Sequence, residues 1–293
     1  MSVLWRAKQV STILVSHIFP IGFAAWLMSF VMRVPYVIIL HGLDVEIAKR
    51  RHPFFTRWIV RRAKEVVVNS QALARDVQCF AQISAPTVLL PRVRTAFLQA
   101  STEKTPHPWV HLLTVARLVP RKNHLTVLRA LALLTEDSSV PPWVYTVVGT
   151  GQEEMALTNE IKALGLSDRV RLTGAVDDED LPRLYREADL FVLPTRPDPT
   201  DREGFGIVYL EAGWFGLPSV ATDLPGVNEA VIQDETGWLL KEVEATNPVA
   251  VAHLLKRIIC APDRLREIGE GARARVQSQF TSTKEMQRFL DRL

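Results

Sequence analysis

Apolar residues occur along this chain in short runs, and most runs are separated by amphipathic stretches long enough for a helix. This alternation predicts strands alternating with helices, and therefore parallel sheets in an α/β fold. The six strands expected in the second part are enough for a complete doubly wound domain, whose ligands bind beyond the carboxyl ends of the strands. We expect strands at 11–16, 35–40, 65–69 and 87–90, and then at 110–115, 143–148, 169–172, 189–193, 218–221 and 237–240.

A segment containing Pro and Thr at about 96–108 separates the two parts. We therefore predict an N-terminal Rossmann-like domain over 1–100 and a second Rossmann-like domain over 101–275. The last helical segments carry apolar residues at helical spacing, which predicts that they pack against another surface. We expect the C-terminal helix, within 276–293, to pack back toward the first domain.

The stretch from Val10 to Met32 contains no Asp, Glu, Lys or Arg and is long enough to span a bilayer of about 30 Å. Ser16, His17, Pro20 and Gly22 interrupt it, which favours a buried strand, a turn over 17–21 and a helix over 22–32. A membrane-spanning segment is the alternative. A cleaved signal peptide is disfavoured because no small-residue cleavage site ends the run.

Composition places the chain among ordinary globular proteins, with 47% hydrophobic and 23% charged residues. Only Cys79 and Cys260 occur, so neither a disulfide framework nor a thiolate metal site is indicated. The seven His residues have no paired-ligand spacing. These features suit a reducing cytosol, and we expect a cytoplasmic protein.

The formal charge of +3 is unevenly distributed, because residues 1–100 carry 13 Lys and Arg against 4 Asp and Glu. Many of these cations lie in the segment 49–64, where they are interleaved with Phe54, Phe55, Trp58 and Ile59. This pattern is typical of a peripheral contact with an anionic membrane surface. The alternative is that the aromatic residues are core and the cations a solvated face. No nucleic-acid-binding motif is present, so nucleic acid is not an expected partner.

Two carboxylates, Glu203 and Glu211, flank a glycine pair and an apolar stretch. A helix that begins near Phe205 would direct its free N–H groups and its dipole at an anion beside 204–207. Glu211 would then lie roughly 12 Å along the axis from Glu203. This spacing matches an elongated ligand with hydroxyl groups at both ends and phosphate between them, such as a nucleotide sugar. The alternative is a buried helix with two incidental glutamates.

Two further segments could hold phosphate. Arg117 and Lys122 follow a predicted strand, just before a helix that we expect to begin at Asn123, and both cations bind phosphate oxygens well. Gly149 and Gly151 form a tight turn after another strand, where backbone can approach a nucleotide closely. Solvated surface charge is the alternative for the two cations.

Six motifs, in this order and spacing, resemble the retaining glycosyltransferases of family 4, which have the GT-B fold. The resemblance covers roughly residues 36–290 and implies two Rossmann-like domains facing a cleft. It also implies transfer of a sugar from a nucleotide-sugar donor to a glycan or lipid-linked acceptor, with retention of configuration, in polysaccharide or glycolipid biosynthesis. The motifs are Val115–Lys122, Val148–Gly151, Asp168–Gly174, Ala188–Pro194, Glu203–Glu211 and Gly216–Ala221.

The resemblance also implies roles for individual residues. Arg117 and Lys122 would hold the donor diphosphate and stabilise the charge on the leaving group. Glu203 would contact hydroxyls of the transferred sugar and Glu211 the ribose, while His41 would face the sugar from the first domain. The remaining implied donor-binding residues are Gly149, Gly151, Val176 near the base, Gly204, Phe205, Gly206 and Ile207.

The chain departs from this family in its first domain, which has only four recognisable strands. The family's opening strand and its glycine-rich loop have no counterpart before Ser11. We therefore expect an incomplete first sheet with an apolar edge. A catalytically weak nucleotide-sugar-binding remnant, or one subunit of a split glycosyltransferase, is the alternative function. Another GT-B chemistry, such as sugar-nucleotide epimerisation, is a third.

No metal or cofactor is expected, beyond the nucleotide sugar as substrate. Asp178-Glu179-Asp180 has the DxD form of metal-dependent glycosyltransferases of another fold. It stands where acidic residues favour the start of a helix, and we interpret it in that way. Gly149-Thr150-Gly151 is followed by Glu154 where a dinucleotide fingerprint needs Gly or Ala, which disfavours NAD.

Overall fold

The computed structural model of the chain describes residues 11–198 and 204–293. Within these ranges the chain forms two compact units. The N-terminal unit comprises residues 11–91, 204–205 and 282–293, and the C-terminal unit comprises 92–198 and 206–281. Each unit contains one parallel sheet covered by helices on both faces, so the predicted α/β architecture with two parallel sheets is confirmed.

The N-terminal unit contains the four strands predicted from the sequence. They form a parallel sheet in the order β1-β2-β3-β4, in which β1 pairs with β2 alone among the described residues. The strands are β1 (Ile13–Val15), β2 (Tyr36–Leu40), β3 (Glu65–Val68) and β4 (Thr87–Val88). The helices are α2 (Phe23–Met32), α3 (Leu43–Arg51), α4 (Pro53–Arg62), α5 (Gln71–Ala81) and α15 (Lys284–Leu290).

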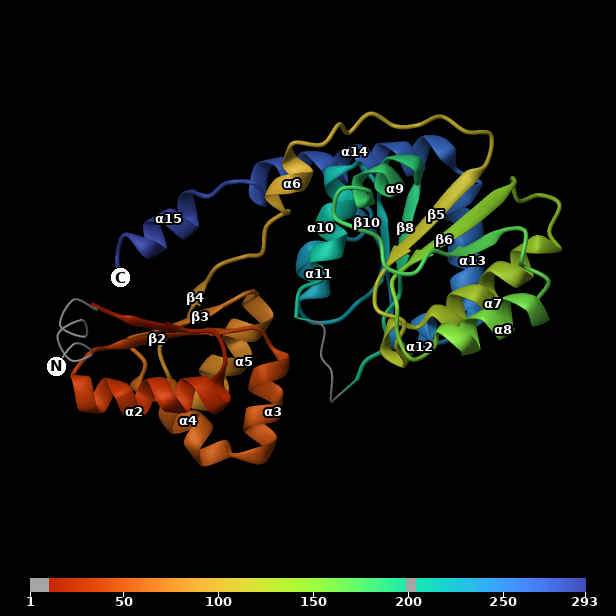
Figure 1. Cartoon of the computed structure of the whole chain (residues 1–293). Helices are drawn as coiled ribbons and strands as arrows, with labels where there is room; N and C mark the ends of the chain where they lie inside the picture. Colours follow the sequence, from red (N-terminus) through yellow and green to blue (C-terminus); the bar gives the residue numbers. More distant parts are fainter. Residues whose placement is uncertain (1–10, 199–203) are drawn as a thin grey trace. The chain divides into compact units, whose positions relative to one another are not determined.

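Alternate residues of β2 and β3 enter different cores. Ile38 and Val66 pack in the cluster formed with α2 to α5, whereas Val37 and Val67 pack against Phe289 of α15. Figure 1 shows α15 on one side of this sheet and α2 and α4 on the other. Both faces of these strands are therefore buried, which explains why they read as nearly continuous apolar runs.

The uncharged stretch before residue 33 folds as a strand, a turn and a helix, as predicted. β1 is followed by a turn over 18–22 and then by α2, which ends where Arg33 takes a left-handed conformation (φ 53°). Among residues 11–198 and 204–293, no helix is both long enough and apolar enough to cross a membrane.

Helix α4 exposes most of its aromatic residues. Phe54 and Phe55 are 82% and 56% exposed, whereas Ile59 is fully buried. The interpretation of these aromatic residues as core is therefore wrong for Phe54 and Phe55. Trp58 is 36% exposed and packs against Trp26 of α2, with ring centroids 4.2 Å apart.

The C-terminal unit contains all six predicted strands in a parallel sheet of order β10-β9-β8-β5-β6-β7. They are β5 (Val110–Val115), β6 (Trp143–Val148), β7 (Val170–Leu172), β8 (Leu190–Leu193), β9 (Ser219–Thr222) and β10 (Gly237–Leu240). The helices are α6 (Thr95–Leu98), α7 (His124–Thr135), α8 (Glu154–Ala163), α9 (Leu181–Glu187), α10 (Ile207–Trp214), α11 (Val227–Ala230), α12 (Glu242–Ala245), α13 (Pro248–Ile259) and α14 (Pro262–Gln279).

Helices cover both faces of this larger sheet. Leu112 and Val192 pack with α7, α8 and α13 in one large apolar core. On the other face, Phe191 contacts Tyr185 of α9 and Tyr209 of α10 through their rings. Burial on both faces holds the strands rigidly, and this leaves their carboxyl ends as a fixed platform for the loops that follow.

Candidate functional site

The strand order of the C-terminal unit creates a switch point between β5 and β8. From β5 the chain continues outward to β6 and β7, whereas β8 starts the other half of the sheet. In doubly wound sheets, ligands bind outside the carboxyl ends of the strands at such a point. The loops that follow β5 and β8 are joined here, because Arg196 donates its backbone N–H to the Arg121 carbonyl (2.8 Å).

Asn123 holds the two loops in place. Its side-chain amide donates to the carbonyls of Pro194 (2.8 Å) and Ala245 (2.7 Å). Its Oδ1 accepts hydrogen bonds from the Thr126 hydroxyl and from Arg196 Nε, each at 2.6 Å. Asn123 is 2% exposed and has a left-handed backbone (φ 62°), a conformation that Asn tolerates better than most residues. Sequence reasoning missed this role, although an Asn just before a helix could have suggested it.

The two predicted phosphate-binding cations lie on the loop after β5 and differ in exposure. Arg117 is exposed, whereas Lys122 is only 8% exposed. The interpretation of Lys122 as a solvated surface charge is therefore wrong. The following helix, α7, begins at His124, one residue later than predicted, because Asn123 precedes it in a non-helical conformation.

His124 lies close to the loop that carries these cations, and its pKa is lowered. Its Nε2 lies 3.1 Å from the Arg117 carbonyl oxygen. Burial lowers the pKa of His124, and the charge of the nearby Lys122 lowers it further, whereas the hydrogen bond to the Arg117 carbonyl raises it. His124 is therefore neutral at pH 7, and the cationic character of this loop comes from Lys and Arg.

Gly149 and Gly151 allow two loops to pack closely. A Cβ on Gly149 would lie 2.0 Å from the Ala116 carbonyl oxygen, and one on Gly151 would lie 2.4 Å from the Leu118 oxygen. The Leu118 N–H also donates to the Thr150 carbonyl at 2.9 Å. The space beside both glycines is therefore filled by the chain's own backbone, which the sequence-based expectation of a nucleotide at this position did not anticipate.

The loop after β7 joins the same edge. The Gly149 N–H donates to the Gly174 carbonyl at 2.8 Å, and Gly174 itself has positive φ (71°) with open space where a side chain would be. Val176 follows and is partly buried. The ends of β5, β6, β7 and β8 thus form one continuous rim, on which Arg117, Lys122, Gly149, Gly151 and Val176 all lie.

Helix α10 begins at Ile207, two residues after the predicted start at Phe205. Gly206 has a left-handed backbone (φ 84°) and so cannot belong to the helix, and Phe205 is buried. Ile207 is 45% exposed, so the first turn of α10 reaches the surface. Glu203, the first carboxylate of the motif, lies outside the described residues.

Glu211 is buried on α10 and paired within the C-terminal unit. Its Oε1 accepts from Arg94 Nε (2.7 Å) and its Oε2 from the Tyr185 hydroxyl (3.0 Å). Burial, with the adjacent Glu211 carboxylate, raises the pKa of Tyr185 well above its usual value, so the phenol remains a neutral donor. Arg94 lies far from Glu211 in the sequence, and no local pattern indicated this pair.

Arg94 also forms an ion pair with Asp178. This contact gives the first acidic residue of the DxD-like segment a structural partner. The segment ends at Asp180, directly before α9 begins at Leu181, although Asp180 makes no side-chain cap. Across residues 11–198 and 204–293, no group of three or more His, Cys, Asp or Glu is arranged to hold a metal ion.

In the N-terminal unit, His41 directly follows β2 and is exposed. The turn after β2 is fixed by Asp44, whose Oδ1 accepts from the backbone N–H groups of His41 (3.0 Å) and Gly42 (2.9 Å). Gly204 packs against this turn, since a Cβ there would lie 2.7 Å from the His41 carbonyl oxygen. Gly204 thus contacts protein backbone in the described structure.

A second histidine, which sequence reasoning did not select, accompanies His41. His17 follows β1, and its ring centroid lies 6.1 Å from that of His41. β1 and β2 are neighbouring parallel strands, so residues that follow them lie at the same edge of the sheet. The sequence contained this indication, because both histidines come directly after predicted strands.

The architecture and the rim define the class of the protein. Two parallel doubly wound α/β units, one of which gathers cationic and glycine-containing loops at its switch point, are the features of a GT-B glycosyltransferase fold. The chain belongs to the family described as "Glycosyl transferases group 1", whose profile matches residues 101–275. Residues 2–92 match the profile of the "Glycosyl transferase 4-like domain".

Individual relatives agree with this family. The chain is 31% identical over 192 residues to the amylovoran biosynthesis glycosyltransferase AmsK of Erwinia amylovora, covering 64% of this chain and 46% of AmsK. It is 29% identical over 318 residues to the D-inositol 3-phosphate glycosyltransferase of Salinispora tropica, covering 98% of this chain and 64% of that protein. The chain thus spans from about half to two thirds of the length of these relatives.

A solved structure with the same fold is that of Anabaena HepE in complex with UDP. It superposes with a TM-score of 0.82 at 22% sequence identity and covers 100% of this chain and 81% of HepE. At this level of identity the similarity establishes the fold alone.

Proposed function

We propose that this chain transfers a sugar, with retention of configuration, from a nucleotide-sugar donor to a glycan or lipid-linked acceptor. The observation that carries this proposal is the rim of the C-terminal unit, where Arg117 and the buried Lys122 lie at the β5/β8 switch point. Burying the charge of a lysine is costly unless negative charge lies near it. A bound diphosphate would bring further negative charge to Lys122. The relatives named above are glycosyltransferases of polysaccharide and inositol type, which supports the proposal.

In this proposal the diphosphate is held by charge and by oriented N–H groups. Arg117 and Lys122 stabilise the negative charge that develops as the nucleoside diphosphate leaves. The free N–H groups at the start of α10, from Ile207, add donors and a favourable dipole. Because these groups supply the positive charge, no metal ion is required, and chelation with EDTA should leave transfer unchanged.

In this proposal Glu211 contacts the ribose, although it is already paired with Arg94. Each carboxylate oxygen has two lone pairs, and Arg94 and Tyr185 each occupy one. Lone pairs therefore remain on Glu211, and Arg94 and Tyr185 fix the direction of its carboxylate, but Glu211 is 2% exposed, so a ribose hydroxyl reaches it only after neighbouring side chains move. We further propose that His41 and Glu203 contact the transferred sugar.

The alternative, a weakly active donor-binding protein or one subunit of a split enzyme, has one observation in its favour. The N-terminal sheet has four described strands, and β1, at its edge, pairs only with β2 there. A complete donor site combined with an incomplete acceptor side would bind nucleotide sugar but turn it over slowly. Binding and turnover must therefore be measured together.

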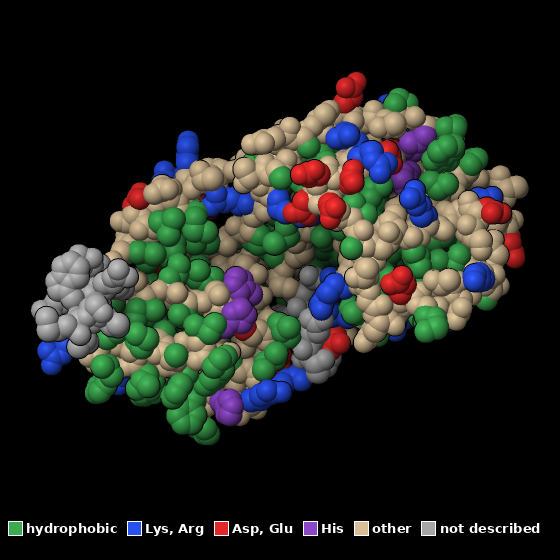
Figure 2. All heavy atoms as spheres, viewed as in Figure 1, with side chains coloured by type: hydrophobic (Ala, Val, Ile, Leu, Met, Phe, Trp, Pro, Cys, Tyr) green, Lys and Arg blue, Asp and Glu red, His purple; other side chains and the backbone are tan. Residues whose placement is uncertain are grey.

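We also propose that the N-terminal unit contacts an anionic membrane surface through α2 and α4. Phe30 and Val31 on α2 are 78% and 71% exposed, and Phe54 and Phe55 on α4 are also exposed. Figure 2 shows hydrophobic side chains gathered over this part of the unit. Soluble proteins rarely leave such a group of large apolar side chains exposed without a partner.

The cations beside this surface complement acidic lipids. Arg57 and Arg61 donate through Nε to the carbonyls of Phe80 (2.9 Å) and Ala81 (2.5 Å), and Arg62 lies over the Trp58 ring. Backbone carbonyls and aromatic rings do not neutralise the charge of an arginine. The positive charge therefore remains available beside exposed aromatic residues, which is the combination that an anionic interface binds.

A thermal-shift screen with UDP, GDP, ADP and their common sugar conjugates tests the proposed function. A nucleotide that binds only the folded protein raises Tm by mass action. We expect one nucleotide series to raise Tm, and Arg117→Ala to abolish that shift. A shift together with turnover supports the transferase, whereas a shift without turnover supports the remnant or split enzyme. A well-folded protein that responds to no nucleotide contradicts both.

A further inference from the structure

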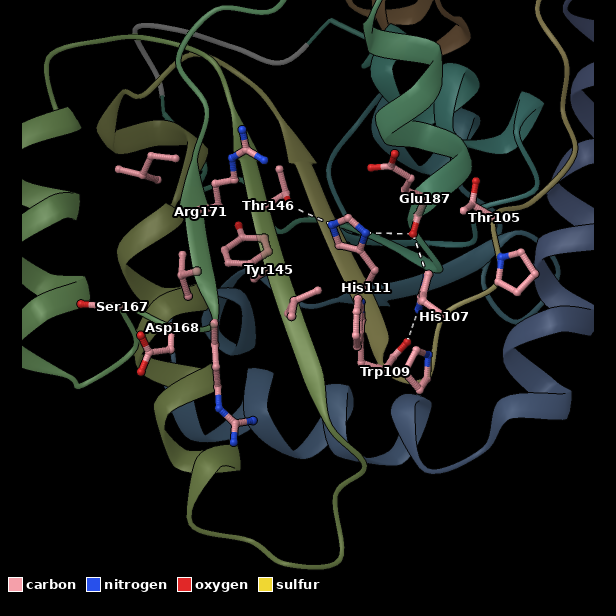
Figure 3. Close-up of a pocket in the computed structure, with 16 residues that line it drawn as sticks. Thr105, His107, Trp109, His111, Tyr145, Thr146, Ser167, Asp168, Arg171 and Glu187 are labelled. Atoms are coloured by element: carbon pink, nitrogen blue, oxygen red, sulfur yellow. Dashed lines mark hydrogen bonds between the residues drawn. The ribbon is translucent and has the colours of Figure 1, made fainter.

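A cavity lies in the C-terminal unit, at the amino ends of β5, β6 and β7 (Figure 3). Its volume is about 870 Å³, within the range of about 300–1,000 Å³ that is common for ligand pockets. One wall is formed by the segment 105–109 before β5, and the other by residues 167–172 of β7 and the turn before it.

This cavity is separate from the rim at the carboxyl ends of the strands. Neither Arg117, Lys122 nor the glycines of the rim line it, but its wall at 168–172 belongs to a segment that leads to Gly174 and Val176 and was predicted to lie near the donor base. His111 lies four residues before the end of β5 and Thr146 lies two residues before the end of β6, which corresponds to about 13 Å and about 7 Å along the strands. The cavity therefore lies on the amino-terminal side of the cations of the rim, although it comes closer to the loops that carry Gly149 and Gly174.

The wall at residues 105–109 is an aromatic platform. Trp109 is 43% exposed and stacks on His107, with ring centroids 5.6 Å apart and an interplanar angle of 15°. Pro106 and Pro108 extend this apolar surface. A hydrogen bond from His107 Nε2 to the Glu187 carbonyl (2.8 Å) fixes the orientation of the His107 ring and therefore of the platform.

The floor of the cavity is polar and electrically neutral. His111 Nδ1 donates to the Glu187 carbonyl (2.8 Å), and its Nε2 accepts from the Thr146 hydroxyl (2.8 Å). Burial lowers the pKa of His111, and the neighbouring His107 lowers it further, whereas the hydrogen bond to the Glu187 carbonyl raises it. The net effect is a lowered pKa, so the ring is neutral at pH 7. In Figure 3 these side chains lie between Trp109 and Arg171.

The opposite wall offers hydrogen-bonding groups of both kinds. Asp168 supplies acceptor oxygens, Arg169 and Arg171 supply donors, and the Ser167 hydroxyl can do either. Asp168 and Arg171 are exposed, so their polar groups are accessible to a ligand. An apolar platform facing mixed donors and acceptors suits a molecule with one apolar face and many hydroxyl groups.

The charges around this cavity are of both signs. Glu187 is the last residue of α9, and the C-terminus of a helix carries partial negative charge. Its carbonyl accepts hydrogen bonds from His107 and His111, and its carboxylate is paired with Arg183 (2.9 Å). A phosphate group could pair with Arg169 and Arg171, whereas the platform of Trp109 and His107 and the neutral His111 suit an uncharged ring that carries hydroxyl groups.

We infer that this cavity is a second, non-catalytic binding site for an uncharged glycan segment. One sugar ring lays its C–H face on Trp109, while its hydroxyls and those of the next ring reach Asp168, Arg169 and Arg171. The site goes beyond the proposed transfer reaction, because it would hold a glycan remote from the donor diphosphate. Its occupant is recognised by ring stacking and hydroxyl hydrogen bonds alone.

Saturation-transfer NMR and calorimetry with maltotriose, cellotriose and mannotriose test this site. We expect at least one trisaccharide to bind the wild-type chain, and Trp109→Ala to weaken that binding about tenfold, since the loss of an aromatic stacking partner typically has this size. Arg171→Ala, on the opposite wall, should weaken it as well. Leu133→Ala is the matched control, because it removes a similarly exposed apolar side chain (47%) from α7.

The outcomes separate this site from the catalytic one. Binding that survives in Arg117→Ala and is lost in Trp109→Ala supports the inference, provided that the Tm values of the variants match the wild type. Binding lost in Arg117→Ala but kept in both Trp109→Ala and Arg171→Ala would assign the glycan to the transferase site and overturn it. Failure of all three trisaccharides to bind the wild-type chain would overturn it too. The nucleotide-induced shift in Tm should be unchanged in Trp109→Ala.

Discussion

At the residue scale, the rim depends on side chains whose importance comes from their partners. Lys122 was selected for its charge, but its burial distinguishes it from the exposed Arg117 on the same loop. Asn123, which has no charge, makes four hydrogen bonds that fix where this loop ends and α7 begins. The residue types in the sequence thus indicated phosphate binding at this loop, and burial in the structure shows that Lys122 and Asn123 are the side chains held rigidly there.

Removing Arg117 and removing Lys122 should change the kinetic constants of the enzyme in different ways. Arg117→Ala should weaken nucleotide binding and also lower kcat by roughly 10²–10³-fold, because it removes a group that stabilises charge in the transition state. Lys122→Ala should mainly raise KM for the nucleotide sugar. Steady-state kinetics with the donor found in the thermal-shift screen measures both effects.

Arg129→Ala provides the control for these variants. Arg129 lies on α7, is half-exposed and pairs with Glu160, so its loss should leave both constants unchanged. Full activity in Arg117→Ala and Lys122→Ala would show that the diphosphate is bound elsewhere.

At the element scale, the loops after β5 and β6 pack more closely than side chains would allow. The Gly149→Ala Cβ would overlap the Ala116 carbonyl, so the loops would have to separate. We expect this variant to lose about 1–3 kcal/mol more free energy of unfolding than Gly165→Ala. Gly165 has positive φ (68°) and open space around it, whereas Gly149 has φ 137°, so the expected difference combines the overlap with Ala116 and greater backbone strain. Urea unfolding of both variants provides the measurement, and equal losses would contradict the packing argument.

A partly buried lysine joins the segment before β5 to the end of α9. Lys104 donates to the Ala188 carbonyl, and burial lowers its pKa to about 8, with Asp189 opposing this effect. Between about pH 8 and 10.5 the unfolded chain retains a proton that the folded chain has lost, so this group makes stability rise with pH.

Lys104→Met should abolish that rise. We expect the wild type to gain of the order of 1–3 kcal/mol over the variant between pH 8 and 10.5. Denaturant unfolding at several pH values measures the difference. Lys162→Met, which changes an exposed lysine on α8, should follow the wild-type curve. Parallel curves for wild type and Lys104→Met would show that Lys104 titrates normally.

At the scale of the whole molecule, the uneven charge predicts a salt-dependent interaction of the N-terminal unit. The chain should cosediment with vesicles containing phosphatidylglycerol and not with neutral phosphatidylcholine vesicles, and salt should weaken binding. Phe54→Ser with Phe55→Ser should reduce binding several-fold, because each removes buried apolar area at the interface.

Met155→Ser is the matched change in the other unit, where Met155 is 75% exposed. It should bind vesicles like the wild type. If it weakened binding as much as the change at Phe54 and Phe55, a general loss of surface hydrophobicity would explain the result, and α4 would not be the membrane contact.

Much of the fold could be predicted from the sequence because its strands are buried on both faces. Every strand of the two sheets was expected within about two residues at each end, from apolar runs such as 110–115 and 143–148. Local patterns were less reliable at loops and helix starts. The start of α10 moved to Ile207 because the left-handed backbone of Gly206 cannot be inferred from hydrophobicity.

The sequence by itself determined the α/β class, the strand positions and the cations at strand ends, because burial and periodicity are local properties of the chain. The tertiary structure alone decided which partners these residues meet. Glu211 pairs with Arg94, β2 and β3 share a core with α15 at the end of the chain, and Trp109 lines a cavity with Arg171. Such contacts join residues far apart in the sequence, and they exist only after the sheets have brought these segments together.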